Sequence, residues 1–329
     1  MQPQNRMRLY QATDAMDGNK GTVVVYNYKT GQTVCMVSAP NYDPLEVPED
    51  IDTNTSGKYD GIYLNRAISG VFTPGSTFKV VTAICAIENI PGIYDKTFNC
   101  TGKYTTGKGE GNGDVICHST HGKITFEEGL NYSCNVVFGT IATYLGAEKL
   151  TETVRQLGFG ENVTISKADA VRSTFDLTDT TRLDVGWAGI GQYTTLVNPC
   201  QMLMLMGGIA NGGKAMIPYL VESSSELVDI KGKVNTAFTL SPETASAIKK
   251  LLRSNVENYY GDELFPGLEM CGKTGTAEVP PDEDHAWFVG FSQRIDFPYA
   301  VVVCLENGGS GYDDAIPVAN AVLQALDED

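Results

Sequence analysis

The sequence predicts a mixed α/β fold in which an antiparallel β-sheet is flanked by helices and joined to a mostly helical lobe. Thr22–Tyr26 and Thr33–Val37 lie on either side of a short turn and predict a hairpin. Ala286–Phe291 and Tyr299–Leu305 are rich in β-branched and aromatic residues and predict two further strands. Ser76–Ile87 is apolar with almost no charge, so it predicts a buried helix. We expect a cleft between the sheet and the lobe to hold the functional site.

The composition limits the classes of protein to which the chain can belong. Its 329 residues are 42% hydrophobic, enough to bury a full core as one large domain or two lobes. A formal net charge of −16 argues against nucleic acid as a partner. No apolar run approaches the ~18 residues that a bilayer-spanning helix needs. We expect residues 1–18 to be a helical remnant of a truncated preceding region. Residues 19–329 should form one domain, with its helical lobe at about residues 80–210.

Three short motifs occur in a defined order: Ser-x-x-Lys at Ser76–Lys79, Ser-x-Asn at Ser133–Asn135, and Lys-Thr-Gly at Lys273–Gly275. Each alone is a weak signal, but in this order they are typical of serine acyl-transferases that act on penicillin-like amides. A second Lys-Thr-Gly, at residues 29–31, lies in the predicted hairpin turn. A second Ser-x-x-Lys, at residues 246–249, has no Ser-x-Asn between it and Lys273. The order of the motifs therefore selects the first set.

Ser76 is the expected nucleophile. It follows a Pro-Gly pair, which breaks regular structure and lets a backbone approach closely, and it begins the predicted helix. Lys79 lies three residues later on the same helical face and can reach the Ser76 hydroxyl. To act as a base Lys79 must be neutral, whereas a free lysine has a pKa near ~10.4. Burial among apolar neighbours and the nearby charge of Lys273 would both lower the pKa of Lys79.

The other two motifs supply the proton relay and the substrate contacts. Ser133 and Asn135 lie on a turn that enters a helix, where they can relay a proton to the leaving amine and hold the substrate amide. Lys273 offers a second charge beside the nucleophile.

The residues after Lys273 are expected to contact the substrate. The hydroxyls of Thr274 and Thr276 can bind a substrate carboxylate together with Lys273. Gly275 leaves space beside the nucleophile, and the backbone amides of Ser76 and Thr276 would form an oxyanion hole.

Around these motifs the chain resembles the transpeptidase domain of a class B penicillin-binding protein. The resemblance extends from about Gly21 to the C-terminus. Four further segments carry it: Ser38–Pro44, Leu64–Ala67, Gly189–Gln192 before Asn198-Pro199, and Trp287–Phe291.

The resemblance implies a serine D,D-transpeptidase that cross-links peptidoglycan stem peptides through an acyl-enzyme and is inhibited covalently by β-lactams. It implies no cofactor for catalysis and action at the extracytoplasmic face of the bacterial membrane. A membrane anchor and a pedestal domain are expected outside this chain. A polymerising glycosyltransferase is a further expected partner.

Two alternative functions remain open, a D,D-carboxypeptidase with water as acceptor and a β-lactam sensor that is acylated once. Sensors similar to class D enzymes favour Ser-x-Val over the Ser-x-Asn found here. A β-lactamase is disfavoured because the stretch Glu127–Asn131, which resembles the deacylation motif of class A enzymes, precedes Ser133 rather than following it. An acyl-enzyme formed with penicillin should therefore persist.

The cysteines fall into two groups. Cys100, Cys117, His121 and Cys134 offer three thiolates and an imidazole, which suit a structural zinc ion, and similar stretches in some class B relatives hold metal ligands. A Cys100–Cys117 disulfide and unrelated thiols are the alternatives, and His118 could replace His121 with poorer reach. The remaining cysteines are expected to be small core residues: Cys35, Cys85, Cys200, Cys271 and Cys304.

His285, beside Trp287, is expected to be structural rather than catalytic. The stretches at residues 103–114 and 223–225 are expected to be exposed loops.

Overall fold

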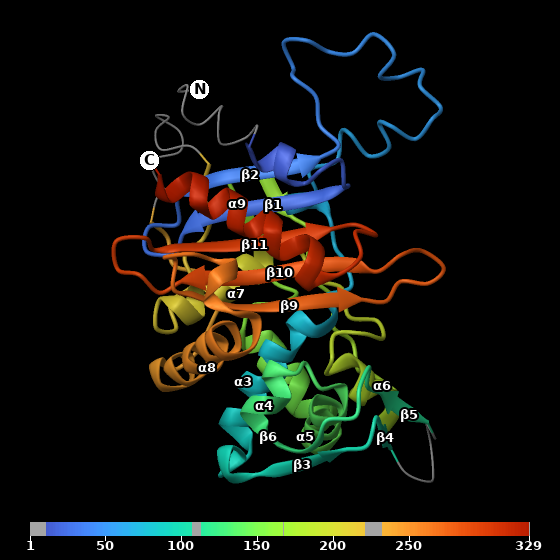
Figure 1. Cartoon of the computed structure of the whole chain (residues 1–329), viewed down its shortest axis with the longest axis vertical. Coiled ribbons are helices and arrows are strands. Elements are labelled where there is room, and N and C mark those ends of the chain that lie inside the picture. Colours follow the sequence, from blue (N-terminus) through green and yellow to red (C-terminus); the bar gives the residue numbers. More distant parts are fainter. Residues whose placement is uncertain (1–10, 107–112, 167, 221–231, 329) are drawn as a thin grey trace.

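A five-stranded antiparallel sheet forms the centre of the computed structural model, which describes residues 11–106, 113–166, 168–220 and 232–328 (Figure 1). The strand order is β2-β1-β11-β10-β9, so the N-terminal hairpin pairs with the C-terminal strands. The predicted hairpin and both predicted C-terminal strands are present. The strands are β1 (Gly21–Asn27), β2 (Thr33–Ala39), β9 (Met270–Ala277), β10 (His285–Ser292) and β11 (Tyr299–Leu305).

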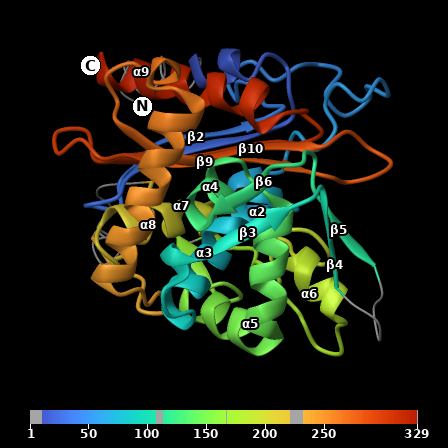
Figure 2. The ribbon, with the colours of Figure 1, turned by 60° about the horizontal axis from the view of Figure 1, so that its bottom comes forward.

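The sheet is covered on both faces, which explains why β1 is a continuous apolar run. Its alternate side chains enter two different cores: Val23 and Val25 pack with α9 (Ile316–Asp327), whereas Val24 and Tyr26 pack with α7 (Pro199–Ala210). Figure 2 shows the helices on either side of the strands. This two-sided burial fixes the sheet as the rigid support of the molecule.

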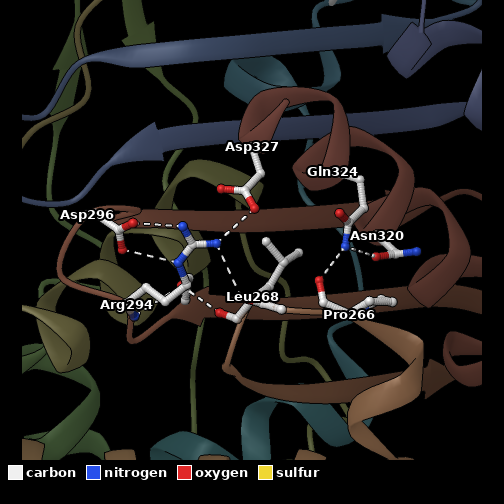
Figure 3. Close-up of polar contacts among 9 residues, drawn as sticks. Pro266, Leu268, Arg294, Asp296, Asn320, Gln324 and Asp327 are labelled. Atoms are coloured by element: carbon white, nitrogen blue, oxygen red, sulfur yellow. Dashed lines mark hydrogen bonds and ion pairs between the residues drawn. The ribbon is translucent and has the colours of Figure 1, made fainter. Parts of the chain in front are cut away.

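The C-terminal helix is fastened to the outer face by side-chain contacts (Figure 3). Arg294 donates hydrogen bonds to Asp296 and to Asp327 at the end of α9, each at 2.8 Å. Gln324 donates to the carbonyl of Pro266 at 2.9 Å. Because these contacts lie on the face of the sheet opposite α7, they support the sheet without touching the helical lobe.

The helical lobe lies below the sheet in Figure 1 and contains more strand than the sequence predicts. Its helices are α3 (Lys79–Asn89), α4 (Phe126–Asn131), α5 (Asn135–Gln156) and α6 (Arg182–Ala188). Three short strand pairs accompany them: β3 (Thr97–Cys100) with β6 (Gly122–Thr125), β4 (Lys103–Thr105) with β5 (Asp114–Ile116), and β7 (Val163–Ile165) with β8 (Ala168–Ala170).

The boundary of the predicted lobe needs correction at its C-terminal end. The predicted span reaches residue 210, but α7 packs on β1, β10 and β11 and belongs to the sheet. The reason is that α7 is apolar on every side, since its residues from Pro199 to Ile209 are buried. A helix that is apolar on every side must be covered on every side, and α7 packs against the sheet and α8 (Pro242–Asn255).

Shorter elements connect these layers. They are α2 (Arg66–Ser69), the 3₁₀ turns η1 (Gly75–Phe78), η2 (Ile93–Asp95) and η4 (Asp262–Leu264), and the π-helical turns η3 (Val256–Tyr260) and η5 (Gly311–Ala315).

Several smaller predictions can also be compared with the fold. Of the predicted loop at residues 103–114, the two ends form β4 and β5, and residues 107–112 lie outside the described residues. The loop at 223–225 and residues 1–10 also lie outside them, while residues 11–15 are helical. All five cysteines predicted for the core are buried there. Among the described residues, no helix has the length and apolar character needed to cross a membrane.

Candidate active site

The turn that carries Ser76 is clamped between strand β9 and the loop at residues 189–192. Ser76 lies in η1, and the α-helix begins at Lys79, three residues later than the sequence predicts. Gly75 has φ of 52°, and a Cβ there would lie 2.7 Å from the Thr276 carbonyl oxygen. The Gly75 amide donates to the Gly191 carbonyl at 3.0 Å, and a Cβ on Gly191 would lie 2.0 Å from the Gly75 oxygen. Both positions therefore require glycine.

Lys79 is fully buried beneath Ser76 and contacts both serines of the motif set. Its Nζ lies 2.9 Å from Ser76 Oγ and 3.1 Å from Ser133 Oγ. It also donates to the Ser133 carbonyl and to Asn135 Oδ1, both at 2.6 Å. The pKa of Lys79 falls well below its ordinary value, first because burial removes water and second because the charge of Lys273 is close. A neutral amine in this place can accept the Ser76 proton.

Ser133 is presented by a tight turn between α4 and α5. Its φ of 52° places it in the left-handed region, and its amide donates to the Leu130 carbonyl at 3.0 Å. Cys134 follows as the N-cap of α5, which begins at Asn135. Asn135 uses its other amide atom to donate to the Ile116 carbonyl at 2.8 Å. The predicted turn into a helix is thus confirmed, and it fixes Ser133 Oγ above Lys79.

Lys273 completes the cluster from the sheet side. It is fully buried, and its Nζ donates to Ser133 Oγ at 3.0 Å and to the Thr274 carbonyl at 3.1 Å. Burial lowers the pKa of Lys273 to about 7. The structure brings the predicted Ser76, Lys79, Ser133, Asn135 and Lys273 into one hydrogen-bonded cluster.

Strand β9 presents its hydroxyls to solvent and its glycine to the nucleophile turn. Tyr260 Oη lies 2.8 Å from Thr274 Oγ1, and the Gly311 amide donates to Thr276 Oγ1 at 3.2 Å. A Cβ on Gly275 would lie 2.8 Å from the Pro74 oxygen and 3.1 Å from the Thr77 nitrogen. The absence of a side chain at Gly275 therefore permits β9 to touch the turn, as the sequence predicts.

A cleft of about 1020 Å³ opens over this cluster. Its walls come from both the sheet and the helical lobe, in agreement with the predicted location. Lys79 and Lys273 lie beneath the floor rather than on its surface. The lining residues are Ser76, Ile116, His118, Asn131, Tyr132, Ser133, Asn135, Trp187, Tyr259, Tyr260, Thr274, Thr276, Glu278, Asp284, Ser310 and Tyr312.

Several of these residues carry no signal in the sequence motifs. Tyr260 and Tyr312 reach the cleft from η3 and η5, far along the chain from the motifs, and no local signal marks them. Gln192 fixes the end of β9, because its side-chain amide donates to the Glu278 carbonyl at 3.3 Å and accepts from the Glu278 amide at 2.9 Å in the orientation that satisfies both. Glu278 could have been found from the alternation that places Thr274 and Thr276 on the cleft face.

The four predicted metal ligands converge beside Ser133. The ligand atoms of Cys100, Cys117, His121 and Cys134 all lie within 4.8 Å of one another. Cys117 Sγ is 3.8 Å from Cys134 Sγ and 3.7 Å from His121 Nδ1. A tetrahedral zinc ion with Zn–S of about 2.3 Å and Zn–N of about 2.0 Å would separate two sulfurs by about 3.8 Å, and sulfur from nitrogen by about 3.5 Å. The donor set fits such an ion.

The alternatives to this ligand set fit the structure less well. His118 is not part of the group and instead lines the cleft, with its ring 5.5 Å from that of His121. Cys100, Cys117 and Cys134 are separate thiols, without a Cys100–Cys117 disulfide. His285, predicted to be structural, accepts a hydrogen bond from the Asn307 amide at 3.1 Å and packs edge-on against Phe72.

Comparison with known proteins identifies the same domain. Residues 21–326 match the family described as the penicillin-binding protein transpeptidase domain. The peptidoglycan D,D-transpeptidase PbpA of Mycolicibacterium smegmatis is 30% identical over 345 residues, covering 95% of this chain and 69% of the relative. Penicillin-binding protein 3 of Bacillus subtilis is 26% identical and is matched over 93% of this chain and 48% of its own length.

Solved structures agree with this result. The D,D-transpeptidase domain of a peptidoglycan glycosyltransferase from Eggerthella lenta superposes with a TM-score of 0.83 at 28% identity, covering 98% of this chain and 81% of the other. Penicillin-binding protein A from M. tuberculosis, solved as a ceftriaxone acyl-enzyme complex, gives a TM-score of 0.83 at 25% identity, with coverage of 98% and 78%.

Proposed function

This chain belongs to the penicillin-binding protein transpeptidase family, and we propose that it is a serine D,D-transpeptidase that cross-links peptidoglycan stem peptides through Ser76. The observation that carries the proposal is the position of Lys79 Nζ, 2.9 Å from Ser76 Oγ and 3.1 Å from Ser133 Oγ. One neutral amine can then receive a proton from the nucleophile and pass it towards the leaving group.

In the acylation step, Ser76 Oγ attacks the carbonyl carbon of the penultimate D-alanine while its proton moves to Lys79. The backbone amides of Ser76 and Thr276 stabilise the oxyanion. The C–N bond then breaks, and the terminal D-alanine leaves with a proton relayed from Lys79 through Ser133 Oγ. Lys273, 3.0 Å from that oxygen, stabilises negative charge on the hydroxyl during the relay.

The terminal carboxylate of the donor peptide binds to Thr274 and Thr276. Both hydroxyls line the cleft, whereas Lys273 is fully buried beneath them. Lys273 therefore contributes by the charge that it places under the strand and not by an open contact on the cleft surface. Gly275 keeps this strand close to the nucleophile.

The acyl-enzyme is resolved by an amine of a second stem peptide. The amine attacks the ester carbonyl, the C–O bond to Ser76 breaks, and the amine proton returns through Lys79 to Ser76 Oγ. A β-lactam forms an ester at the same oxygen, but the nitrogen expelled when its ring opens stays covalently attached to the acyl group, so no leaving group departs to make room for the acceptor amine. Glu127 and Glu128 do not activate water at this ester, because Glu127 binds Ser254 and Glu128 caps α4 at Thr125.

Cys100, Cys117, His121 and Cys134 are proposed to hold a structural zinc ion. Four protein ligands leave no open position, so a bound ion would supply rigidity and no chemistry. Cys134 is the middle residue of the Ser133–Asn135 motif. The hydrogen bond between Cys134 and Cys117 lowers the pKa of Cys117 and raises the pKa of Cys134, so without an ion the pair favours a single thiolate, on Cys117. The cluster thereby fixes the turn that presents Ser133.

The substrate also sets the place of action. Peptidoglycan stem peptides lie outside the cytoplasmic membrane, so we place the reaction on the extracytoplasmic face. A membrane anchor outside residues 19–329 and a polymerising glycosyltransferase as a partner remain predictions of the family resemblance.

Turnover of an acyl-D-alanyl thioester donor in the presence of an amine acceptor tests the proposal. The protein should form the amide product repeatedly, and Ser76→Ala should abolish it. Ser246→Ala is the matched control, because Ser246 begins the second Ser-x-x-Lys but lies on α8 outside the cleft. A single turnover would instead indicate a sensor, and hydrolysis without amide formation a carboxypeptidase.

A further inference from the structure

Strand β9 is the last strand of the sheet, and side chains from the end of α8 and from η3 cover its open edge. β9 pairs with β10 on its other side, where Thr274 lies opposite Phe288. On the open side, the Gly272 carbonyl accepts a hydrogen bond from Asn255 Nδ2 at 2.8 Å. The Thr274 amide donates to Tyr260 Oη at 3.0 Å. The phenol of Tyr260 therefore takes the place beside Thr274 that a further strand would have.

The direction of the hydrogen bond between the hydroxyls of Tyr260 and Thr274 follows from burial. Tyr260 Oη and Thr274 Oγ1 lie 2.8 Å apart, so one hydroxyl donates to the other. Only 4% of Tyr260 is exposed, and burial raises its pKa, so the phenol keeps its proton at neutral pH. A buried O–H without an acceptor is costly, and Thr274 Oγ1 is the acceptor that the described residues offer. Tyr260 is therefore the donor.

This direction decides where the proton of the Thr274 hydroxyl points. A threonine hydroxyl has one proton and two acceptor positions. Tyr260 fills one acceptor position, and the Thr274 side chain lines the cleft, so its own proton is directed into the cleft. Thr274 then meets a ligand as a hydrogen-bond donor, which suits a carboxylate above the buried charge of Lys273. If Thr274 donated to Tyr260 instead, only lone pairs would face the cleft, and lone pairs repel an anion.

The phenol is held in place by packing that does not involve its oxygen. The ring of Tyr260 contacts the rings of Tyr259 and Tyr312, with centroid distances of 5.7 Å and 5.8 Å. Tyr260 ends the π-helical turn η3, and Gly261 follows with φ of 99°. Tyr260→Phe therefore removes the hydrogen bonds to Thr274 and keeps the ring in its place.

We propose that Tyr260 is a positioning residue that orients the Thr274 hydroxyl as a hydrogen-bond donor to the carboxylate of the donor substrate. The inference rests on the proposed transpeptidase function, which places that carboxylate against Thr274. Tyr260 acts through Thr274 and touches no reacting atom. A hydroxyl already turned towards the anion needs no reorganisation on binding, so Tyr260 favours substrates with a carboxylate over neutral analogues.

The test compares benzylpenicillin with its methyl ester, which has the same ring system and side chain but no carboxylate charge. The second-order rate constant for acylation of Ser76 is measured for both by intact mass. In Tyr260→Phe, the rate constant for benzylpenicillin should fall about ten-fold, the loss expected for one hydrogen bond to a charged group. The rate constant for the ester should change by about two-fold or less, because that hydrogen bond is to a neutral group. The ratio of the two rate constants does not depend on the fraction of the variant that is folded.

Two further variants separate positioning from a structural effect. Tyr28→Phe is the matched control, because it removes another buried phenol hydrogen bond, to the Ser292 carbonyl at 3.1 Å, outside the cleft. It should leave both rate constants unchanged. Thr274→Val removes the hydroxyl that Tyr260 orients. Adding Tyr260→Phe to Thr274→Val should therefore lower the rate constant for benzylpenicillin no further.

Two results would overturn the inference. Equal losses with benzylpenicillin and its ester would show that Tyr260 supports the fold and does not act on the carboxylate. Losses from Tyr260→Phe and Thr274→Val that multiply in the double variant would show that Tyr260 acts independently of Thr274. If the unaltered protein forms no Ser76 adduct with benzylpenicillin, the proposed function itself fails, and that outcome is distinct from both.

Discussion

Lys79 and Lys273 reach the same hydroxyl oxygen, with their Nζ atoms 3.1 Å and 3.0 Å from Ser133 Oγ. One nitrogen comes from the helical lobe and the other from the sheet. The charge of Lys273 opposes a charge on Lys79, and burial lowers the pKa of both amines. Ser133 thus contacts both halves of the site, and the free-base state of Lys79 is reached at a lower pH than for an ordinary lysine.

The first prediction concerns the pH dependence of acylation. The rate of acylation by penicillin should rise with pH as Lys79 loses its proton. Lys273→Met removes the positive charge that helps to lower the pKa of Lys79, so the rising limb should move to higher pH. Lys273→Arg keeps the charge and is the control. Stopped-flow acylation from acid to alkaline pH measures both variants, and an unmoved limb in Lys273→Met would contradict the account.

The second prediction concerns the contact between β9 and the nucleophile turn. Gly275→Ala places a methyl group 2.8 Å from the Pro74 oxygen and should push the strand away from Ser76. Misplacing reacting groups by about 1 Å lowers rates roughly a hundred-fold. Gly212→Ala is the matched control, because its methyl group contacts nothing within 4 Å, although it is strained at φ of 65°. It should lower the melting temperature and leave acylation intact.

The third prediction concerns the metal cluster. Chelation of zinc, or Cys100→Ser, should lower the melting temperature by roughly 5 °C or more and slow acylation as well, because the turn carrying Ser133 loosens. Elemental analysis should find about one zinc ion per chain in the unaltered protein. Cys85→Ser is the control, since Cys85 is buried but lies outside the cluster, where it donates to the Lys149 carbonyl at 3.5 Å. Loss of zinc without any change in the acylation rate would show that the metal cluster does not hold Ser133 in position.

The fourth prediction concerns the hydrogen bonds between the start of α7 and the end of α2. Asn198 caps α7 at the Cys200 amide and donates to the carbonyls of Ile68 and Gly70, both at 2.9 Å, in a buried position. Asn198→Ala removes the cap and leaves the buried Gly70 carbonyl without a donor, whereas the Ile68 carbonyl still accepts from the Val171 amide at 2.9 Å. The free energy of unfolding should fall by roughly 2–4 kcal/mol in chemical denaturation. Asn211→Ala, at the C-cap of α7, removes only exposed hydrogen bonds with Lys29 and Lys214 and should cost less than about 1 kcal/mol.

The sequence predicts the parts of this molecule that depend on local chemistry. The hairpin of β1 and β2, the strands β10 and β11 and the turn before Asn135 follow from residue patterns over a few positions. The order of the motifs identifies Ser76 and Lys79, whose separation of three residues brings their side chains together in a helical turn.

The remaining features depend on contacts between distant segments. The apolar run of α7 is compatible with either lobe, and only the packed structure shows that it covers the sheet. Tyr260 reaches Thr274 from a π-helical turn whose geometry no short pattern marks. Ligand chemistry predicts that Cys100 and Cys134 come together. Only the folded structure shows that Cys117 and His121 lie with them beside the turn that carries Ser133.

Mapping the penicillin adduct tests the central claim most directly. The protein is incubated with penicillin, its intact mass is measured, and the modified peptide is sequenced by fragmentation. The account predicts one adduct per chain, on Ser76, that persists for much longer than an enzyme turnover of about one second, and no adduct in Ser76→Ala. An adduct formed at the normal rate in Ser76→Ala, or one mapped to another serine, would contradict the assignment of Ser76 as the nucleophile.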